Sequence, residues 1–429
     1  MKRFKKLLFT FLLLALPSIA FGATLNYEAA IDDTLYTTLE EAVLKASDGD
    51  TIKLLANVTL EDTLTIDKDI TIDMNDFNIE AKQKVLKIEN GNLVLTGKGT
   101  IRETVPDYYA IVLKGSRNED DIDYSTLTIG EDITVEGWSA ILIDRLGEVS
   151  VNAITTIYED TTTYDTAYGI KVDVYGKLIS KNDTSDDGGF GIYINGNIKH
   201  MTNYPEVHIY DGASIDSTNA GIYMAGYGEV TIDEASINGI GSGIAMKSGV
   251  LNLNKTNVTS TGEKQNPISY ADRIGPTGAA ILIESNNDYA GNMIINISDS
   301  DLYSENNSAI LEYIGNTTTR DTSITEISIN GNGTYTSNKD VATLKLSDYF
   351  SGKFITGGYF SKDPTKYVAS GYKATKDGDM YKVTKKFFLS TMAEADSEEK
   401  SKFPVILIII GGAILVFVAY KLINKYKNK

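Results

Sequence analysis

The sequence predicts an all-β solenoid, and three observations lead to this prediction. Most apolar residues stand in short runs that alternate with polar residues, which is typical of β-strands. The chain of 429 residues contains 37 glycines and only 7 prolines. A phrase of Gly or Ala, then Ile, then an alternating strand recurs at spacings of 22 to 37 residues. Self-similarity at this period predicts coils that each bury an apolar side against the next coil.

The isoleucines of the phrase predict which residues occupy equivalent positions on successive coils. They are Ile111, Ile141, Ile170, Ile192, Ile222, Ile244, Ile281 and Ile310. We expect them to line a common apolar interior, with neighbouring coils about 4.8 Å apart. A row of immunoglobulin-like sandwiches is the competing architecture, but each unit needs seven strands and usually a buried tryptophan. The chain has one tryptophan and short repeats, so we predict a parallel β-helix over 51–385.

A short helix near the amino terminus is the exception to the strand pattern. Leu39, Ala42, Val43 and Ala46 form one apolar face of this segment. Thr38 and Glu41 have the spacing of a capping box, which favours a helix start. We predict that residues 23–50 form a cap with this helix at one end of the solenoid.

The amino terminus predicts a secretory signal peptide over 1–22. Basic residues precede an apolar run at 7–16. Small residues follow at Ala20 and Gly22, the −3 and −1 positions of a cleavage site. The predicted cleavage lies between Gly22 and Ala23.

The carboxyl-terminal region predicts a membrane anchor. Residues 403–420 carry no charge, and a helix of this length spans about 27 Å, enough to cross a bilayer core. The basic tail 421–429 predicts that this side faces the cytoplasm. The polar segment 386–402 is expected to act as a tether. Together these segments predict a single-pass protein of the cell membrane with its amino-terminal ectodomain outside the cell.

Composition excludes several kinds of chemistry. The chain has no cysteine, which excludes disulfides, thiolate zinc sites and cysteine nucleophiles. It has two histidines, so there is little material for imidazole metal sites. The formal net charge is −18, and so acidic a protein repels phosphate backbones. We therefore expect no nucleic-acid partner.

Two stretches resemble known bacterial proteins. Residues 37–43 (TTLEEAV), 49–54 (GDTIKL) and 70–75 (ITIDMN) look like the opening of pectate-lyase-like right-handed β-helices. Residues 355–364 (ITGGYFSKDP) and 367–372 (YVASGY) are similar to the closing segment of surface proteins from Firmicutes-type bacteria. The resemblance implies a right-handed parallel β-helix with a capping helix, and an adhesin-like role more than catalysis. The Asn-Thr-Asp, Gly-His-Gly and Arg-Ile-Lys motifs of related hydrolases do not occur.

The repeat predicts one row of outward-facing polar residues. If the isoleucines point inward, the residue three positions later points outward. The row then contains Lys114, Asp144, Asp173, Asn195, Ala225, Lys247 and Glu284. Asp144 and Asp173 would lie on neighbouring coils, where a divalent cation such as Ca²⁺ would stabilise both carboxylates and Asn195 would add an oxygen ligand. Ordinary solvent-facing side chains are the alternative interpretation.

The neighbouring outward row predicts an aromatic pair. Tyr193 and Tyr223 would stack on adjacent coils as a platform for sugar rings or for a protein patch. Tyrosine is also an ordinary strand residue, and the chain has 26 of them. Both interpretations stay open from the sequence.

These features predict a cell-surface adhesin-like or glycan-recognition protein that presents an extended β-helix face. The expected partners are an extracellular polysaccharide or the surface of a host or neighbouring cell, with the membrane contacted through 403–420. A polysaccharide lyase or glycoside hydrolase acting on acidic glycans is one alternative, and a structural spacer or surface-layer component is another. No catalytic residue is identified, and calcium is the one candidate cofactor.

Overall fold

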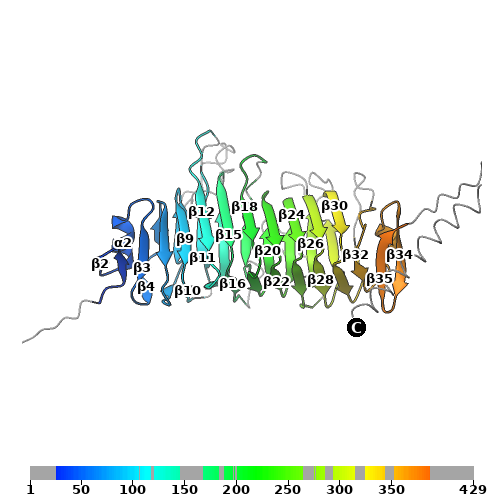
Figure 1. Ribbon diagram of the computed structural model, residues 1–429, viewed down its shortest axis with the longest axis horizontal. Coiled ribbons are helices and arrows are strands. Elements are labelled where there is room, and N and C mark those ends of the chain that lie inside the picture. Colours follow the sequence, from blue (N-terminus) through cyan, green and yellow to red (C-terminus); the bar gives the residue numbers. More distant parts are fainter. Residues whose placement is uncertain are drawn as a thin grey trace, which may run out of the picture. The chain divides into compact units, whose positions relative to one another are not determined.

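The computed structural model describes residues 26–386, apart from residues 106, 117–119, 145–167, 183–187, 197, 199–200, 264–274, 276, 286–292, 315–323 and 344–351. The strands in this part of the chain form three sheets, which we name sheets A, B and C. Successive coils of the chain contribute neighbouring strands to each sheet (Figure 1).

Sheet A contains, in spatial order, β2 (Thr34–Tyr36), β1 (Ala29–Ile31), β3 (Thr51–Leu54), β6 (Ile70–Asp73), β9 (Asn92–Thr96), β12 (Ser125–Ile129), β15 (Ile170–Val174), β18 (Glu206–Ile209), β21 (Glu229–Asp233), β24 (Gly249–Asn254), β27 (Met293–Ser298) and β30 (Ile324–Asn330). Sheet C contains β32 (Ala342–Thr343), β29 (Ile310–Ile314), β26 (Ala279–Ser285), β23 (Ser242–Met246), β20 (Ala220–Met224), β17 (Ile192–Ile194), β14 (Ser139–Asp144), β11 (Tyr109–Lys114), β8 (Leu86–Glu89) and β5 (Leu64–Ile66).

Sheet B contains β34 (Tyr372–Asp377), β35 (Met380–Lys385), β33 (Tyr359–Phe360), β31 (Thr334–Ser337), β28 (Asp301–Ser304), β25 (Asn257–Ser260), β22 (Ser236–Gly239), β19 (Ser214–Ser217), β16 (Lys177–Ser180), β13 (Ile133–Gly137), β10 (Gly99–Glu103), β7 (Ile79–Ala81) and β4 (Val58–Leu60). The helices among the described residues are α2 (Leu39–Lys45) and the 3₁₀ turn η3 (Thr365–Tyr367).

The ladders between coils are parallel, as in β12 with β15, β13 with β16 and β14 with β17. Antiparallel pairing occurs at the two ends of the stack. At the amino-terminal end β1 pairs antiparallel with β2 and β3, and at the other end β33 pairs antiparallel with β35. Strands that visit three sheets in turn and pair in parallel with the next coil define a parallel β-helix. The prediction of an all-β solenoid is confirmed.

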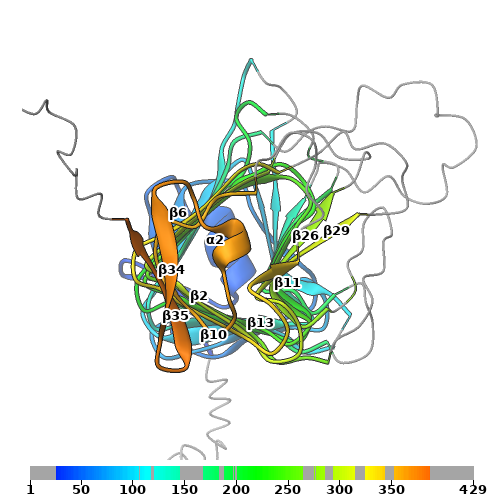
Figure 2. The same cartoon turned by 90° about the vertical axis from the view of Figure 1, so that its right-hand side faces the viewer.

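The interior is built from the inward side chains of each strand. Figure 2 looks along the stack and shows the three sheets surrounding this interior. On sheet C, Ile222 pairs with Ile192 on one side and with Ile244 on the other, and all three side chains are fully buried. Burial of a side chain of this size contributes about 1.5–3 kcal/mol. β-Branched residues also suit the extended backbone of these short strands.

Ile170 does not belong to the predicted row of isoleucines. Ile141 pairs directly with Ile192 on sheet C. Ile170 lies on sheet A, where it pairs with Ser125 of β12. The coil between Ile141 and Ile192 is longer than the others, and its strand on sheet A begins with the same Gly-Ile phrase. The prediction was wrong here because the phrase identifies an inward-facing strand start but not the sheet to which the strand belongs.

The amino-terminal helix is confirmed. Thr38 is the N-cap of α2, and its Oγ1 accepts a hydrogen bond of 3.1 Å from the backbone N–H of Glu41. This bond satisfies one of the free amide groups of the first turn. Leu39, Ala42 and Val43 are buried. The apolar face of α2 thus packs on the first coil of the stack (Figure 1).

The predicted transmembrane helix requires a correction. Among the described residues, no helix is long and apolar enough to cross a membrane. Residues 403–420 lie outside the described part of the chain, as do the tail 421–429 and the predicted cleavage site at Gly22 and Ala23. We therefore correct the fold class to a parallel β-helix with an amino-terminal capping helix, and we withdraw the membrane localisation. The signal peptide over 1–22 stays a prediction.

A buried carboxylate at the corner between sheets B and C makes stability depend on pH. Glu103 is 5 % exposed, and its Oε2 accepts a hydrogen bond of 3.0 Å from the backbone N–H of Trp138. Its Oε1 is buried without a hydrogen-bond partner. Burial, which outweighs the backbone hydrogen bonds, raises the pKa of Glu103 above its ordinary value of 4.5. The folded protein therefore holds this proton more tightly than the unfolded chain.

The substitution Glu103→Gln is expected to remove this dependence. The unfolded chain releases the proton near pH 4.5, so the wild-type protein loses stability as the pH rises from there through the higher folded pKa. The variant should gain melting temperature relative to wild type over that interval and not below it. Thermal unfolding from pH 4 to pH 7 measures the difference, with Glu61→Gln, at an exposed site, as control. An equal difference at every pH would contradict the assignment.

Candidate functional site

The predicted outward row of sheet C is partly assembled as expected. Lys114 on β11 pairs in register with Asp144 on β14, and the Lys114 ammonium contacts the Asp144 carboxylate. Asn195, one coil further, donates a hydrogen bond of 2.7 Å from Nδ2 to Oδ1 of Asp144. The side chains of Lys114 and Asp144 are only 8 % and 18 % exposed. Asp144 is therefore neutralised by a lysine and held by an amide.

Asp173 lies on a different face from Asp144 and Asn195. It sits on β15 of sheet A, where its register partners are Thr128 and His208. Its Oδ1 accepts a hydrogen bond of 3.1 Å from the Tyr210 hydroxyl. The predicted pairing of Asp144 with Asp173 was wrong, for the same reason that Ile170 was misplaced. Within the described residues, no group of three or more His, Asp or Glu side chains is arranged to hold a metal ion.

Tyr193 and Tyr223 are neighbours, as predicted. They pair in register between β17 and β20, and their rings stack with centroids 5.0 Å apart and planes 6° apart. Tyr109 stacks on Tyr193 with a centroid distance of 6.2 Å. Tyr223 is fully buried and packs against Phe190 with a centroid distance of 5.0 Å. The rings thus cover one another's faces, and Tyr223 offers no open face to a sugar.

A second buried charge pair lies further along the same face of sheet C. Lys247 follows β23, and Glu284 lies on β26. The Lys247 Nζ atom is 3.3 Å from Glu284 Oε2, and the side chains are 0 % and 2 % exposed. The Lys247 ammonium also lies 5.7 Å from the centroid of the Tyr223 ring. Side chains enclosed to this degree contribute to packing and stability more directly than to binding.

A concave feature lies on sheet B, at the corner where the chain turns toward sheet C. It has a volume of about 320 Å³, near the lower end of the size of small-molecule sites. We call it the sheet B groove. Its walls come from β16, β19, β22 and β25 and the residues that follow them: Ile179, Ser180, Asp216, Ser217, Thr218, Asn238, Gly239, Ile240, Thr259 and Thr261.

Two rows of side chains border the sheet B groove. The first row consists of outward residues in register on successive coils, Ile179, Asp216, Asn238 and Thr259. The second row, two residues later on each coil, consists of Thr218, Ile240 and Thr261. Small inward residues, Ser217 and Gly239, lie between the rows. The groove therefore runs across coils, and each coil adds its own outward side chains about every 4.8 Å.

Asp216 is the charged centre of the sheet B groove. Its carboxylate is 2.7 Å from Lys177 Nζ, and it accepts a hydrogen bond of 2.9 Å from Asn238 Nδ2. Burial alone would raise the pKa of Asp216, but the hydrogen bonds from Lys177 and Asn238 outweigh it and lower the pKa below 3.8. The carboxylate is thus ionised at neutral pH and acts as a hydrogen-bond acceptor.

Hydroxyl groups in the sheet B groove retain hydrogen-bonding capacity. Ser217 is 6 % exposed, and its Oγ has no hydrogen-bond partner. The Oγ1 atom of Thr218 likewise has none. Buried polar atoms of this kind are few in native proteins, and each calls for a structural or functional explanation.

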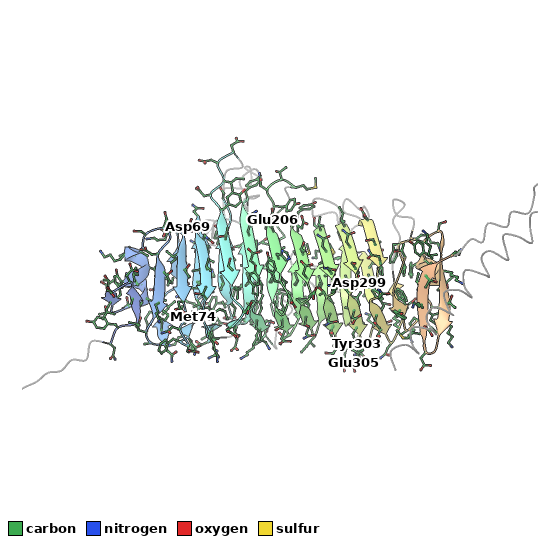
Figure 3. The ribbon with its side chains drawn as sticks, in the orientation of Figure 1. Asp69, Met74, Glu206, Asp299, Tyr303 and Glu305 are labelled. Carbon is green, nitrogen blue, oxygen red and sulfur yellow. The ribbon has the colours of Figure 1, made fainter. Side chains whose placement is uncertain are left out.

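An exposed aromatic side chain stands at one end of the sheet B groove. Tyr303 on β28 pairs in register with Thr259, so it continues the first row by one coil, and it is 40 % exposed. Glu305 follows on the same coil, and Figure 3 shows both side chains on this lower side of the stack. At the other end, the Lys181 ammonium contacts the carboxylate of Glu136. The groove is thus bounded by an ion pair and by an open tyrosine ring.

Neither the sheet B groove nor its residues were singled out from the sequence. Apart from Asp216 and Gly239, the residues that meet there are Ser, Thr, Asn and Ile, which are common in any strand-rich chain. The groove could have been found from the register of the strands in sheet B. The isoleucine phrase gives the register of sheet C, and it does not fix the register of the strands that lie between two copies of the phrase.

Comparison of the chain with protein-family models, curated proteins and solved structures finds no match. The fold and the groove together define a parallel β-helix protein with a groove on one outward face. The resemblance of its opening and closing segments to pectate-lyase-like and bacterial surface proteins stays a prediction.

Proposed function

We propose that the protein recognises a polysaccharide chain without cleaving it, and that the chain binds in the sheet B groove. The observation that carries this proposal is the register of Asp216, Asn238 and Thr259, three hydrogen-bonding side chains on three successive coils. A repeating polymer matches such a surface because each added unit meets the outward side chains of a further coil. Many weak contacts along one rigid face then add to a useful affinity.

The chemistry of the sheet B groove suits sugar rings. Asp216 and Asn238 provide a carboxylate and an amide for hydroxyl groups, and Thr261 provides a hydroxyl. Ile240 is 53 % exposed and offers an apolar surface to the C–H groups of a ring. Tyr303 adds an aromatic face at the end of the groove. A few placed polar groups beside apolar surface are the usual composition of a ligand site.

Recognition is favoured over catalysis because the carboxylates predicted to act together do not meet. Asp144 and Asp173 lie on different sheets, and Asp144 is engaged by Lys114 and Asn195. In the sheet B groove Asp216 is ionised and engaged by Lys177 and Asn238. Glycoside hydrolysis by two carboxylates needs one of them protonated as the acid, and the lowered pKa of Asp216 does not suit that role.

The test screens the full chain against a polysaccharide panel and scores binding and released products in the same wells. We expect binding without products. Asn238→Ala and Tyr303→Ala should each weaken binding about five- to tenfold, the effect of losing one hydrogen bond or one ring contact. Tyr108→Ala is the matched control, because Tyr108 is also 40 % exposed but lies outside the groove.

Three outcomes would count against the proposal. If the wild-type protein bound no polysaccharide of the panel, the proposal that the groove recognises a polysaccharide would be rejected. Unchanged affinity in both groove variants would place the glycan on another face. Release of products would show an enzyme instead.

A further inference from the structure

A second surface of distinct chemistry lies on the outward side of sheet A, across β15, β18 and β21. We call it the β15–β21 face. Register places Lys171, Glu206 and Glu229 in one row, and Asp173, His208 and Thr231 in the next. Tyr175 and Tyr210 follow β15 and β18 directly, in line with Asp233 of β21. This face therefore combines four carboxylates and two tyrosines with a single lysine.

Two of the four carboxylates on the β15–β21 face, Asp173 and Glu229, are held by neutral donors. Asp173 accepts a hydrogen bond of 3.1 Å from the Tyr210 hydroxyl. Glu229 accepts hydrogen bonds of 3.1 Å from the Tyr204 hydroxyl and from Asn252 Nδ2. These donors are neutral, and among the described residues neither carboxylate forms an ion pair with a lysine or arginine. Asp233 lies 2.6 Å from the Nε2 atom of His208.

Aromatic rings stand among these carboxylates. Tyr210 is stacked between Tyr175 and His208, with ring centroids 4.2 Å and 3.8 Å away. On the other side of Tyr175, the equivalent position one coil earlier is Gly130, which has no side chain to cover that ring face. Tyr204 and Tyr227 form an edge-to-face pair 5.2 Å apart next to Glu229. Carboxylates beside tyrosine faces are a suitable setting for organic cations.

The face already holds one such cation from its own chain. The Lys171 ammonium lies 3.2 Å from Glu206 and 5.8 Å from the centroid of the Tyr124 ring. Its side chain is 48 % exposed, so this contact forms at the surface. The arrangement of ammonium, carboxylate and tyrosine shows how a basic side chain of another molecule can be received on the same face.

We propose that the β15–β21 face docks a basic polypeptide segment, whose arginine and lysine side chains bind the carboxylates and lie over the tyrosine rings. The carboxylates are spread over three coils, each with its own hydrogen bonds, so a single small cation cannot engage them together. In an extended peptide, the side chains of residues i and i+2 lie about 6.8 Å apart. The outward side chains along one strand of the face have the same spacing. Arginine suits the face best, because its planar guanidinium pairs with carboxylates and stacks on aromatic rings.

The test measures the anisotropy of a labelled oligo-arginine peptide against the full chain. The double variant Glu229→Gln with Asp233→Asn removes two charges and keeps the size of both side chains and one acceptor oxygen in each, so the fold should remain intact. We expect it to weaken binding about fivefold, and raised salt should weaken the wild-type complex. Glu61→Gln with Asp62→Asn makes the same change of charge at exposed residues outside the face and should leave the affinity unchanged.

The contribution of the rings is tested at Tyr175. Tyr175→Leu should weaken binding of the peptide about threefold. Tyr175→Phe keeps the ring and should bind the peptide as tightly as the wild-type protein does. Equal losses in the two charge variants would show attraction to the net charge of the protein and would overturn the proposal. If a cationic amino-sugar oligomer bound more tightly than the peptide, the proposal of a polypeptide partner would be overturned in favour of a cationic glycan. These results do not depend on the sheet B groove, which lies on another sheet.

Discussion

Replacing Glu284 by alanine is expected to destabilise the protein by about 3–5 kcal/mol. The substitution leaves the ammonium group of Lys247 in a site where its side chain is 0 % exposed, without the carboxylate that lies 3.3 Å from it. A buried charge that loses the carboxylate opposite it is no longer compensated for that part of the cost of its removal from water. Chemical denaturation of wild type and Glu284→Ala measures the difference in the free energy of unfolding.

The control for this prediction removes both charges. In the double variant Lys247→Met with Glu284→Leu, apolar side chains of similar size occupy the same space, and replacements of this kind are often neutral. We expect it to recover most of the stability that Glu284→Ala loses. If the double variant is as unstable as the single one, the loss comes from packing and not from the loss of the ion pair.

Replacing Gly239 by alanine is expected to destabilise the protein by about 3 kcal/mol, at the upper end of the usual cost of overpacking. A Cβ atom at this position would lie 1.7 Å from the carbonyl oxygen of Ser242 and 2.7 Å from the amide nitrogen of Gly221. Both atoms belong to the backbone, so neither can rotate away. The clash would force apart the turn between sheets B and C that forms the floor of the sheet B groove.

Gly212→Ala provides the comparison. Gly212 has a φ of +80° but open space around the position of its Cβ atom, so alanine there bears only the conformational cost of about 1–2 kcal/mol. Thermal unfolding of the two variants separates steric from conformational effects. Equal melting temperatures would contradict the close approach at Gly239. The Gly239→Ala variant should also lose polysaccharide affinity, and Gly212→Ala should not.

The architecture could be predicted because it follows from local pattern. Alternation marks the strands, and recurrence of the Gly-Ile and Ala-Ile phrase at the length of one coil indicates stacking. Ile192, Ile222 and Ile244 indeed pair in register on sheet C. The capping helix was also predictable, because the spacing of Thr38 and Glu41 is a local signal that the structure realises as a hydrogen bond.

The assignment of strands to sheets could not be predicted, because every sheet presents the same alternation. The Gly-Ile phrase at Ile170 starts a strand of sheet A, while those at Ile192 and Ile222 lie on sheet C. The coil between Ile141 and Ile192 is unusually long. Its extra residues do not disturb the alternation of inward and outward residues, so the sequence gives no sign that Ile170 belongs to another sheet. Asp173 shares the strand of Ile170, so the predicted calcium set of Asp144, Asp173 and Asn195 was divided between two faces.

Contacts between residues of ordinary composition were the other part that the sequence did not reveal. His208 had no recognisable partner in the sequence, yet its imidazole lies 2.6 Å from Asp233 on the next coil. The interval of 25 residues between them is one coil plus two residues, because His208 pairs in register with Thr231. Such pairs become visible only when the register of sheet A is known, and the same holds for Asp216 and Asn238 in the sheet B groove.

The antiparallel strands at both ends of the stack have a consequence for self-association. A parallel solenoid that ended on a bare coil would present a template onto which the first coil of another molecule could add, and repetition of that step would produce a fibre. Here β1 and β2 reverse direction at the amino-terminal end, and the hairpin of β34 and β35 does so at the other. The reversed strands end the parallel ladder of sheet A at one end and of sheet B at the other, so head-to-tail addition of a further molecule at these two edges is discouraged by the direction of the backbone itself.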